Sequence, residues 1–219
     1  VQEVKNAIEV YNRMNEYNYK SESDLLKVHS LMMRYFDDDN GEYRNHGEGV
    51  KRNNEIIYMA PSSILVPSLM KSLFAYIANN DLNIIVLAAI FHYYFVSIHP
   101  FSDGNGRCAR FWVTLMLIDY DKNFEFIPLE EEIYLNQDNY YSAIAECHNN
   151  GNANVFIRFI LKTINSSIDK LIRNSNFVLN DIQNEIVLLI TNNNKITQRE
   201  IANITNVNIR TIKRNFKVL

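Results

Sequence analysis

The chain has 219 residues, of which 47% are hydrophobic, and its formal net charge is −3. This length suits one large domain or one domain with a smaller one appended, and the small negative charge gives no general attraction to nucleic acid or to membranes. Six glycines and four prolines beside plentiful Tyr and Phe favour a mainly helical protein. The two cysteines do not indicate a disulfide framework, so we expect a cytoplasmic location.

The first residues predict two helices. Hydrophobic residues recur at helical spacing, at Val1, Val4, Ile8, Tyr11 and Met14. Ser21 and Asp24 then form a capping pattern, which predicts a second helix. Its apolar face runs through Leu25, His29, Met32 and Phe36. The turn-rich stretch DDDNGEYR ends this helical region.

The pattern changes between residues 41 and 60. The sequence GEGVKRNNEIIYMAP combines glycines, an Asn-Asn pair and a short apolar run. It predicts a β-hairpin with its turn near Asn53 and Asn54. An irregular surface loop is the alternative that this stretch leaves open.

Helices are predicted again at about 66–78, 82–97, 107–120, 130–148 and 154–171. The helix at 82–97 is apolar almost throughout, but it is too short for a comfortable membrane span and is typical of a buried core helix. We therefore predict a mainly α fold. A helical core with one β-hairpin occupies residues 1–173, and a linker at 174–176 leads to a smaller module at 177–219.

The module at 177–219 resembles a partial winged helix-turn-helix. From residue 191 onward it holds six Lys or Arg residues and one acidic residue. Thr197 caps the first helix of the pair, and the second helix opens at Asn208 or Thr211. It carries the basic residues Arg210, Lys213 and Arg214. The pattern favours DNA as a partner. A basic helical tail that contacts other proteins is the alternative.

The loop at 99–110, HPFSDGNGRCAR, combines several residue types that suit phosphate chemistry. Its glycines open a helix, whose N-terminal N–H groups attract anions. Arg107 and Arg110 lie three residues apart and offer guanidinium groups to phosphate oxygens. Asp103 is a hard oxygen ligand for Mg²⁺, and His99 titrates near neutral pH. Together they predict a site for nucleotidyl or phosphoryl transfer.

This loop resembles the signature of the Fic family, HPFx(D/E)GNGRxxR, at every fixed position. The stretches GEYR, NYYSAI and NNGNANVFIRFI also resemble segments of the Fic core, so the resemblance covers residues 1–171. It implies a protein adenylyltransferase that moves AMP from ATP to a Ser, Thr or Tyr hydroxyl of a target protein or of itself. His99 would take the proton of that hydroxyl, and Asp103 would hold Mg²⁺ at the α- and β-phosphates.

The resemblance also implies how the substrates are held. Phe101 would anchor the loop in the core. The anion cradle would consist of Gly104, Asn105 and Gly106, with Asn105 at the α-phosphate, while Arg107 and Arg110 would hold the β- and γ-phosphates. Tyr141 and Asn149 match positions that border the adenosine. The hairpin around Val50 matches a flap that clamps the main chain of the target as an added strand.

Other features of the resemblance concern specificity and control. The related Doc branch, which phosphorylates its target, has a lysine at the position of Gly106, so this chain favours AMP transfer. The inhibitory motif (S/T)xxxE(G/N) is not found in the chain, because residues 142–146 have its spacing but lie within a core helix and precede Cys147. We therefore expect the inhibitory glutamate to come from an upstream helix or from an antitoxin chain. A homo-oligomer is also compatible with the family.

Two further residues have a structural and a chemical interpretation. Cys108 lies near a helix N-terminus, which lowers a thiol pKa, but a small packed residue is the favoured interpretation. His92 lies on the apolar helix and is interpreted as a core histidine. As an alternative function, the chain is a DNA-binding regulator that uses its Fic core as a nucleotide sensor. The presence of His99 favours the enzyme, because a sensor needs no base.

Overall fold

The computed structural model describes residues 2–36, 38–52, 55–174 and 179–216, with the side chains of 50–57 and 174 left out. The chain forms two compact units, Val1–Asp169, here called the core unit, and Lys170–Leu219, here called the C-terminal unit. The predicted mainly helical class is confirmed. Residues 175 and 176 of the expected linker lie outside the described residues, so that boundary stays a prediction.

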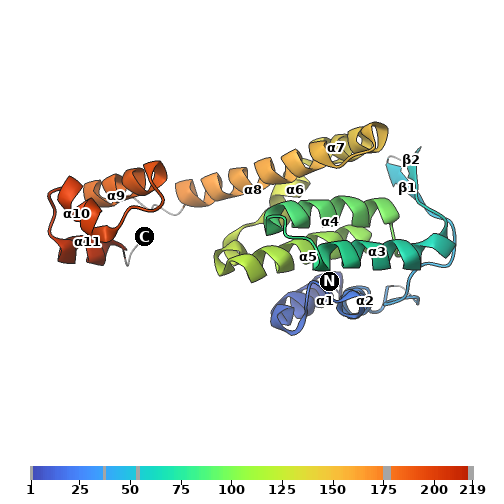
Figure 1. Ribbon diagram of the computed structural model, residues 1–219. Helices are drawn as coiled ribbons and strands as arrows, with labels where there is room; N and C mark the ends of the chain where they lie inside the picture. Colours follow the sequence, from blue (N-terminus) through green and yellow to red (C-terminus); the bar gives the residue numbers. More distant parts are fainter. Residues whose placement is uncertain (1, 37, 53–54, 175–178, 217–219) are drawn as a thin grey trace. The chain divides into compact units, whose positions relative to one another are not determined.

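The core unit is built from helices and one hairpin (Figure 1). Its α-helices are α1 (Gln2–Asn12), α2 (Glu22–Met32), α3 (Val66–Ala78), α4 (Ile84–Ile98), α5 (Asn105–Tyr120), α6 (Leu129–Leu135), α7 (Gln137–Asn150) and α8 (Asn154–Asn174), the last of which continues into the C-terminal unit. Short 3₁₀ turns occur at Met14–Glu16, Ser63–Leu65 and Lys122–Phe126.

The helices α4 and α5 pack against each other at the centre of the core unit (Figure 1). The side chain of Asn83 caps α4 by accepting from the N–H of Ile85 at 2.9 Å. The residues of α4 itself are apolar around most of the helix circumference, as expected for a helix with neighbours on several sides. Trp112 on α5 is fully buried and stacks on Phe91 of α4, and its indole N–H donates to the carbonyl of Tyr19. Among the described residues, no helix is both long and apolar enough to cross a membrane.

The predicted helices at 66–78, 82–97, 107–120 and 154–171 agree with the structure to within three residues at each end, but two others differ more. The helix that begins after Ser21 ends at Met32 and does not reach Phe36, because Tyr35 has a φ of 73°, which a right-handed helix does not contain. The single helix expected at 130–148 is two helices, α6 and α7, which meet at Asn136. The side-chain cap that Ser21 was expected to provide is present, since its hydroxyl accepts from the N–H of Asp24 at 3.2 Å.

The hairpin consists of β1 (Gly49–Arg52) and β2 (Glu55–Met59), which pair antiparallel. Gly49 pairs with Met59 and Val50 with Tyr58, and the register shifts between Val50 and Lys51. The expected turn at residues 53 and 54 lies outside the described residues. A two-stranded hairpin has little stability by itself, so its attachment to the core unit determines where it lies.

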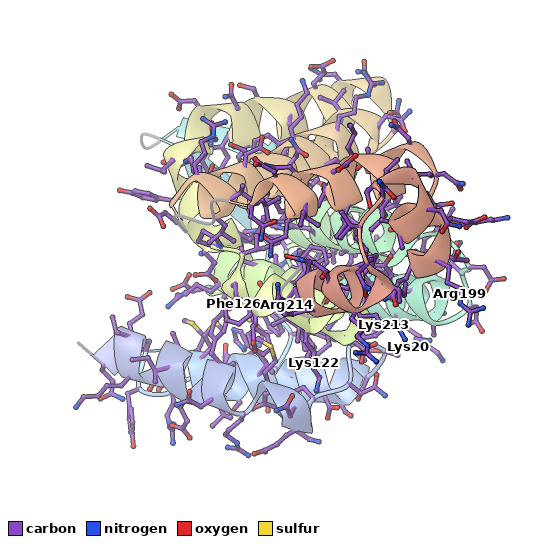
Figure 2. The ribbon with its side chains drawn as sticks, turned by 90° about the vertical axis from the view of Figure 1, so that its left-hand side faces the viewer. Lys20, Lys122, Phe126, Arg199, Lys213 and Arg214 are labelled. Carbon is purple, nitrogen blue, oxygen red and sulfur yellow. The ribbon has the colours of Figure 1, made fainter. Side chains whose placement is uncertain are left out.

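The C-terminal unit contains α9 (Asp181–Asn192), α10 (Gln198–Ile204) and α11 (Ile209–Phe216). Ile186, Ile201 and Ile212 form its small core, one from each helix. Thr197 caps α10 as predicted, in a capping box with Glu200. Arg199, Lys213 and Arg214 are exposed and extend from α10 and α11 (Figure 2). The winged helix-turn-helix assignment stays a prediction.

Candidate active site

The loop between α4 and α5 begins with a sharp change of backbone direction at His99. His99 is the C-cap of α4 and has left-handed backbone angles, φ 52° and ψ 61°. Phe101 is fully buried, as predicted, and anchors the loop. The side chain of Asn105 closes it, because Oδ1 accepts from the N–H of Phe101 at 2.9 Å and Nδ2 donates to the carbonyl of Phe101 at 2.7 Å. Both ends of the Asn105 amide are thus used inside the loop.

The buried side chain of His29 supports this loop from α2. Its ring stacks on Phe101, with centroids 3.6 Å apart and planes 6° from parallel. Nδ1 accepts from the N–H of Gly41 at 2.8 Å, so Nε2 carries the proton and donates to the carbonyl of Asp103, 3.0 Å away. Gly104 has a φ of 78°, and a Cβ there would lie 2.7 Å from Sδ of Met33. Any other residue here would be strained by the left-handed backbone and would require the Met33 side chain to move.

A cavity opens beside the start of α5, and five of the predicted site residues line it. They are His99, Asn105, Gly106, Arg110 and Tyr141. The wall also includes Tyr58 from β2, Tyr140 and His148 from α7, and the apolar side chains of Val96 and Ile144. The structure thus brings a histidine, an arginine and a helix N-terminus to one cavity with an apolar and aromatic wall.

Arg110 approaches Gly106 closely. A Cβ at Gly106 would lie 3.0 Å from Nη1 of Arg110, so glycine leaves room for the guanidinium beside the first turn of α5. On another side, Nε of Arg110 lies 3.8 Å from Oε1 of Glu130, the second residue of α6. Tyr11 donates its hydroxyl proton to the same Oε1 at 2.7 Å. Sequence inspection missed Glu130 and Tyr11, because no local motif marks either residue.

Asp103 and Arg107 lie together on a more exposed part of the loop. Oδ2 of Asp103 accepts from Nη2 of Arg107 at 3.0 Å, and Oδ1 accepts from the N–H of Gly104 at 2.5 Å. Nη1 of Arg107 also donates to Oε1 of Glu3 on α1 at 2.7 Å. Asp103, Gly104 and Arg107 are not among the described residues that line the cavity.

The surroundings of His99 keep its imidazole neutral. Burial lowers the pKa of His99 below its ordinary value, while a hydrogen bond with the backbone of Val96 acts to raise it. The charges of Glu48 and Asp103 also act to raise this pKa, whereas the charge of Arg44 acts in the same direction as burial. A neutral imidazole at neutral pH is able to accept a proton.

His92 and Tyr140 form a buried pair behind the cavity wall. Nε2 of His92 lies 3.1 Å from the hydroxyl of Tyr140. Burial lowers the pKa of His92 to about 3, and Nδ1 has no hydrogen-bond partner in the part of the chain that the structure describes. Cys108 is also buried, and burial raises the pKa of its thiol to about 12. The lowered thiol pKa that a helix N-terminus would give is therefore not present, and Cys108 is a packed core residue.

The two remaining residues of the predicted site are Asn149 and Val50. Asn149 is exposed, and its neighbour His148 lines the cavity instead. The ring of His148 stacks on Tyr58, with centroids 4.1 Å apart, and its Nε2 lies 3.0 Å from Oγ of Ser97. Val50 lies on β1 in the hairpin, but its side chain is outside the described residues.

Comparisons with known proteins relate this chain to a family. Residues 19–117 match the Fic/DOC family. A probable protein adenylyltransferase of Aquifex aeolicus is 25% identical over 147 residues, which are 65% of this chain and 43% of the relative. The protein adenylyltransferase Fic of Drosophila mojavensis is 26% identical over 176 residues, which are 78% of this chain and 32% of the relative. The chain spans less than half the length of either curated relative.

A solved structure is similar over nearly the whole chain. The crystal structure of a Fic family protein from Desulfovibrio desulfuricans matches with a TM-score of 0.77 and 31% identity, covering 98% of this chain and 66% of that one. The chain therefore contains a Fic/DOC family domain, and the helical core with its hairpin is the Fic fold.

Proposed function

We propose that this chain is a protein adenylyltransferase that transfers AMP from ATP to a Ser, Thr or Tyr hydroxyl of a protein, including its own. The observation that carries the proposal is the shared cavity: His99, Arg110 and the first turn of α5 all face one space. The names of the curated relatives support the same class of reaction.

In the proposed reaction the target oxygen attacks the α-phosphorus of ATP. The bond between the α-phosphorus and the oxygen that bridges to the β-phosphate breaks, and pyrophosphate leaves. An imidazole nitrogen of His99 takes the proton of the attacking hydroxyl. The lowered pKa of His99 suits this role, because the base has to be neutral before it accepts the proton.

The phosphates meet positive charge at two places in the cavity. The helix α5 begins at Asn105, so its first N–H groups and its dipole offer a partial positive charge to an anion. The guanidinium of Arg110 lies one turn further along the same helix and suits the β- and γ-phosphates. The apolar and aromatic wall with Tyr141 would hold the adenosine.

Asp103 is the residue that would hold Mg²⁺. Its side chain is 71% exposed and lies two residues before α5, and a single carboxylate next to phosphate oxygens is a donor set that Mg²⁺ accepts. The described residues contain no group of three His, Cys, Asp or Glu side chains that would form a metal site by themselves. The ion would partly neutralise the phosphate charge when bound, while Arg107 steadies the Asp103 carboxylate.

The hairpin is the proposed docking place for the target. An extended target segment would add to it as a strand through main-chain hydrogen bonds. Tyr58 connects this hairpin to the cavity, because its ring lines the wall and stacks on His148. The target hydroxyl would thereby be delivered beside His99.

Two radiolabels test the proposal. The purified chain is incubated with MgCl₂ and with ATP labelled at either the α- or the γ-phosphate, and label on protein is measured. We expect incorporation of the α-label only, and its loss in His99→Ala. Incorporation of the γ-label alone would instead indicate phosphorylation, and incorporation of neither label would contradict the proposal for self-modification.

For the C-terminal unit we propose a DNA partner. On α11 the buried face carries Ile212 and Asn215, while Arg210 is exposed. Lys213 and Arg214 are exposed as well (Figure 2). Such a helix can place basic side chains against phosphates. The double variant Lys213→Ala/Arg214→Ala should weaken binding of duplex DNA and reduce its salt dependence, whereas Lys195→Ala serves as a basic control outside α11. Equal binding by all three chains would contradict the proposal.

A further inference from the structure

Arg44 donates hydrogen bonds to three consecutive backbone carbonyl groups at the end of α4. The residue is only 2% exposed. Its Nε donates to the carbonyl of His99 at 2.7 Å, and its Nη2 donates to the carbonyl of Ile98 at 3.3 Å. The backbone N–H of Arg44 donates to the carbonyl of Pro100 at 2.9 Å. One residue thus fixes the backbone on both sides of His99.

The same guanidinium also holds both ends of the hairpin. Nη1 donates to the carbonyl of His46 at 2.7 Å, before β1, and Nη2 donates to the carbonyl of Pro61 at 2.6 Å, after β2. The N–H of Ala60 donates to the carbonyl of Glu48 at 3.0 Å and closes the base of the hairpin. Arg44 is therefore a bridge between the hairpin and the loop that carries His99.

The chemistry of the guanidinium suits this position. Four neutral carbonyl oxygens receive its N–H groups, and two of these carbonyls belong to the C-terminal end of α4, where the helix dipole is negative. A lysine has the same charge but carries its donors on one nitrogen, so it cannot span the same set of acceptors. These contacts require the planar set of N–H donors of a guanidinium group, and a positive charge alone is not sufficient.

His99 needs such support because its backbone is in the left-handed region, which is unfavourable for a residue with a side chain. We propose that Arg44 is a positioning residue that couples the hairpin to His99, so that the hairpin's position and the direction of the imidazole change together. This inference rests on the proposed function, in which His99 is the base and the hairpin receives the target.

The substitution Arg44→Lys tests the coupling, with Arg34→Lys as the matched control. Arg34 is a partly exposed arginine that pairs with Glu9 away from the cavity. We expect Arg44→Lys to slow transfer by about 10- to 100-fold while the Kd for ATP changes by less than about threefold, because a small misplacement of a reacting group affects the rate far more than binding. Arg34→Lys should change neither quantity. Transfer at the wild-type rate, or equal losses of transfer and ATP affinity, would overturn the inference.

Hydrogen exchange gives a second measurement that does not depend on transfer or on the variant's folding. In the wild-type chain the amides of Arg44 and Ala60 should open together, with the same dependence on denaturant, because one guanidinium holds both segments. Independent opening of Ala60 would overturn the coupling. If the wild-type chain shows no transfer but the two amides open together, the proposed function fails and the coupling stands.

Discussion

Oε1 of Glu130 lies 3.8 Å from Nε of Arg110 and also accepts the hydroxyl proton of Tyr11 at 2.7 Å. A carboxylate therefore faces the guanidinium that the proposed function assigns to the β- and γ-phosphates. The two anions would compete for one cation, although solvent weakens the pair, since the Glu130 side chain is 48% exposed. Although the inhibitory sequence motif is not found in the chain, Arg110 still has a glutamate, Glu130, close to it.

Removing this charge should strengthen nucleotide binding. The variant Glu130→Gln keeps an oxygen that can accept from Tyr11 but no longer attracts Arg110. We expect the Kd for ATP to fall by about two- to fivefold at low salt, in keeping with a partly exposed ion pair. The measurement is titration calorimetry at low and high ionic strength. The control Glu131→Gln changes a neighbouring exposed glutamate, and an equal effect there would show that only net charge matters.

Removing the proposed base should separate chemistry from binding. In His99→Ala the transfer rate should fall by about 10²- to 10⁴-fold, the usual contribution of a general base. ATP should still bind, because Arg110 and the start of α5 are unchanged. Single-turnover assays and ATP titrations check the two halves. A variant that transfers AMP at a near-normal rate would exclude His99 as the base.

As the pH is lowered, the rate of AMP transfer should begin to fall only below the ordinary histidine pKa of about 6.5. Burial lowers the pKa of His99, so the imidazole stays neutral as the pH falls through that value and transfer persists. The rate should decline only as the pH passes the lower pKa. Measuring kcat/KM between pH 5 and pH 8 tests this, and a midpoint above the ordinary value would contradict it.

A comparison of Gly104 with Gly151 measures how much the loop geometry contributes to the free energy of unfolding. Both have positive φ, at 78° and 64°, but a Cβ at Gly104 would meet Met33 whereas a Cβ at Gly151 would meet nothing within 4 Å. Gly151→Ala should lower the free energy of unfolding by about 1–2 kcal/mol, the cost of the left-handed backbone alone. Gly104→Ala should lower it by clearly more. Urea unfolding of both variants gives the comparison, and equal losses would mean that the Met33 side chain moves aside at little cost.

His92 should make stability depend on pH. Its pKa is about 3 in the folded chain, against about 6.5 in an unfolded one. Below about pH 6.5 the unfolded chain binds a proton at this histidine that the folded chain does not bind. The free energy of unfolding therefore decreases as the pH is lowered, by at most about 1.4 kcal/mol per pH unit for this group. The loss continues until the pH passes the folded pKa. The variant His92→Gln should flatten this slope between pH 6.5 and 4, and parallel curves for the two chains would assign the slope to other groups.

The loop at 99–110 could be recognised from the sequence because its chemistry is local. Glycines, histidine and arginines lie within one stretch, and their spacing alone indicates an anion site at a helix start. Most helices also follow from local periodicity, whereas the stretch at 41–60 left both a hairpin and an irregular loop open. The end of α2 and the break at Asn136 do not, because a single left-handed residue or a helix cap sets each of them.

The remaining site residues depend on tertiary packing. Arg44 is 55 residues from His99, and Tyr11 is 119 residues from Glu130, so no local pattern connects either pair. Asn149 and His148 illustrate a different difficulty. Successive helical residues point about 100° apart, so His148 lines the cavity while the adjacent Asn149 is exposed. The sequence carried no sign of which of the two faces the cavity.

Both native thiols of the chain, Cys108 and Cys147, are buried. A thiol-reactive dye should therefore leave the native protein unlabelled, and a cysteine introduced on the surface becomes the single point of attachment. Met59 at the end of β2 is 63% exposed and suits such a label. Fluorescence from Met59→Cys would then follow the hairpin directly as nucleotide or target is added, in a chain whose own cysteines need no replacement.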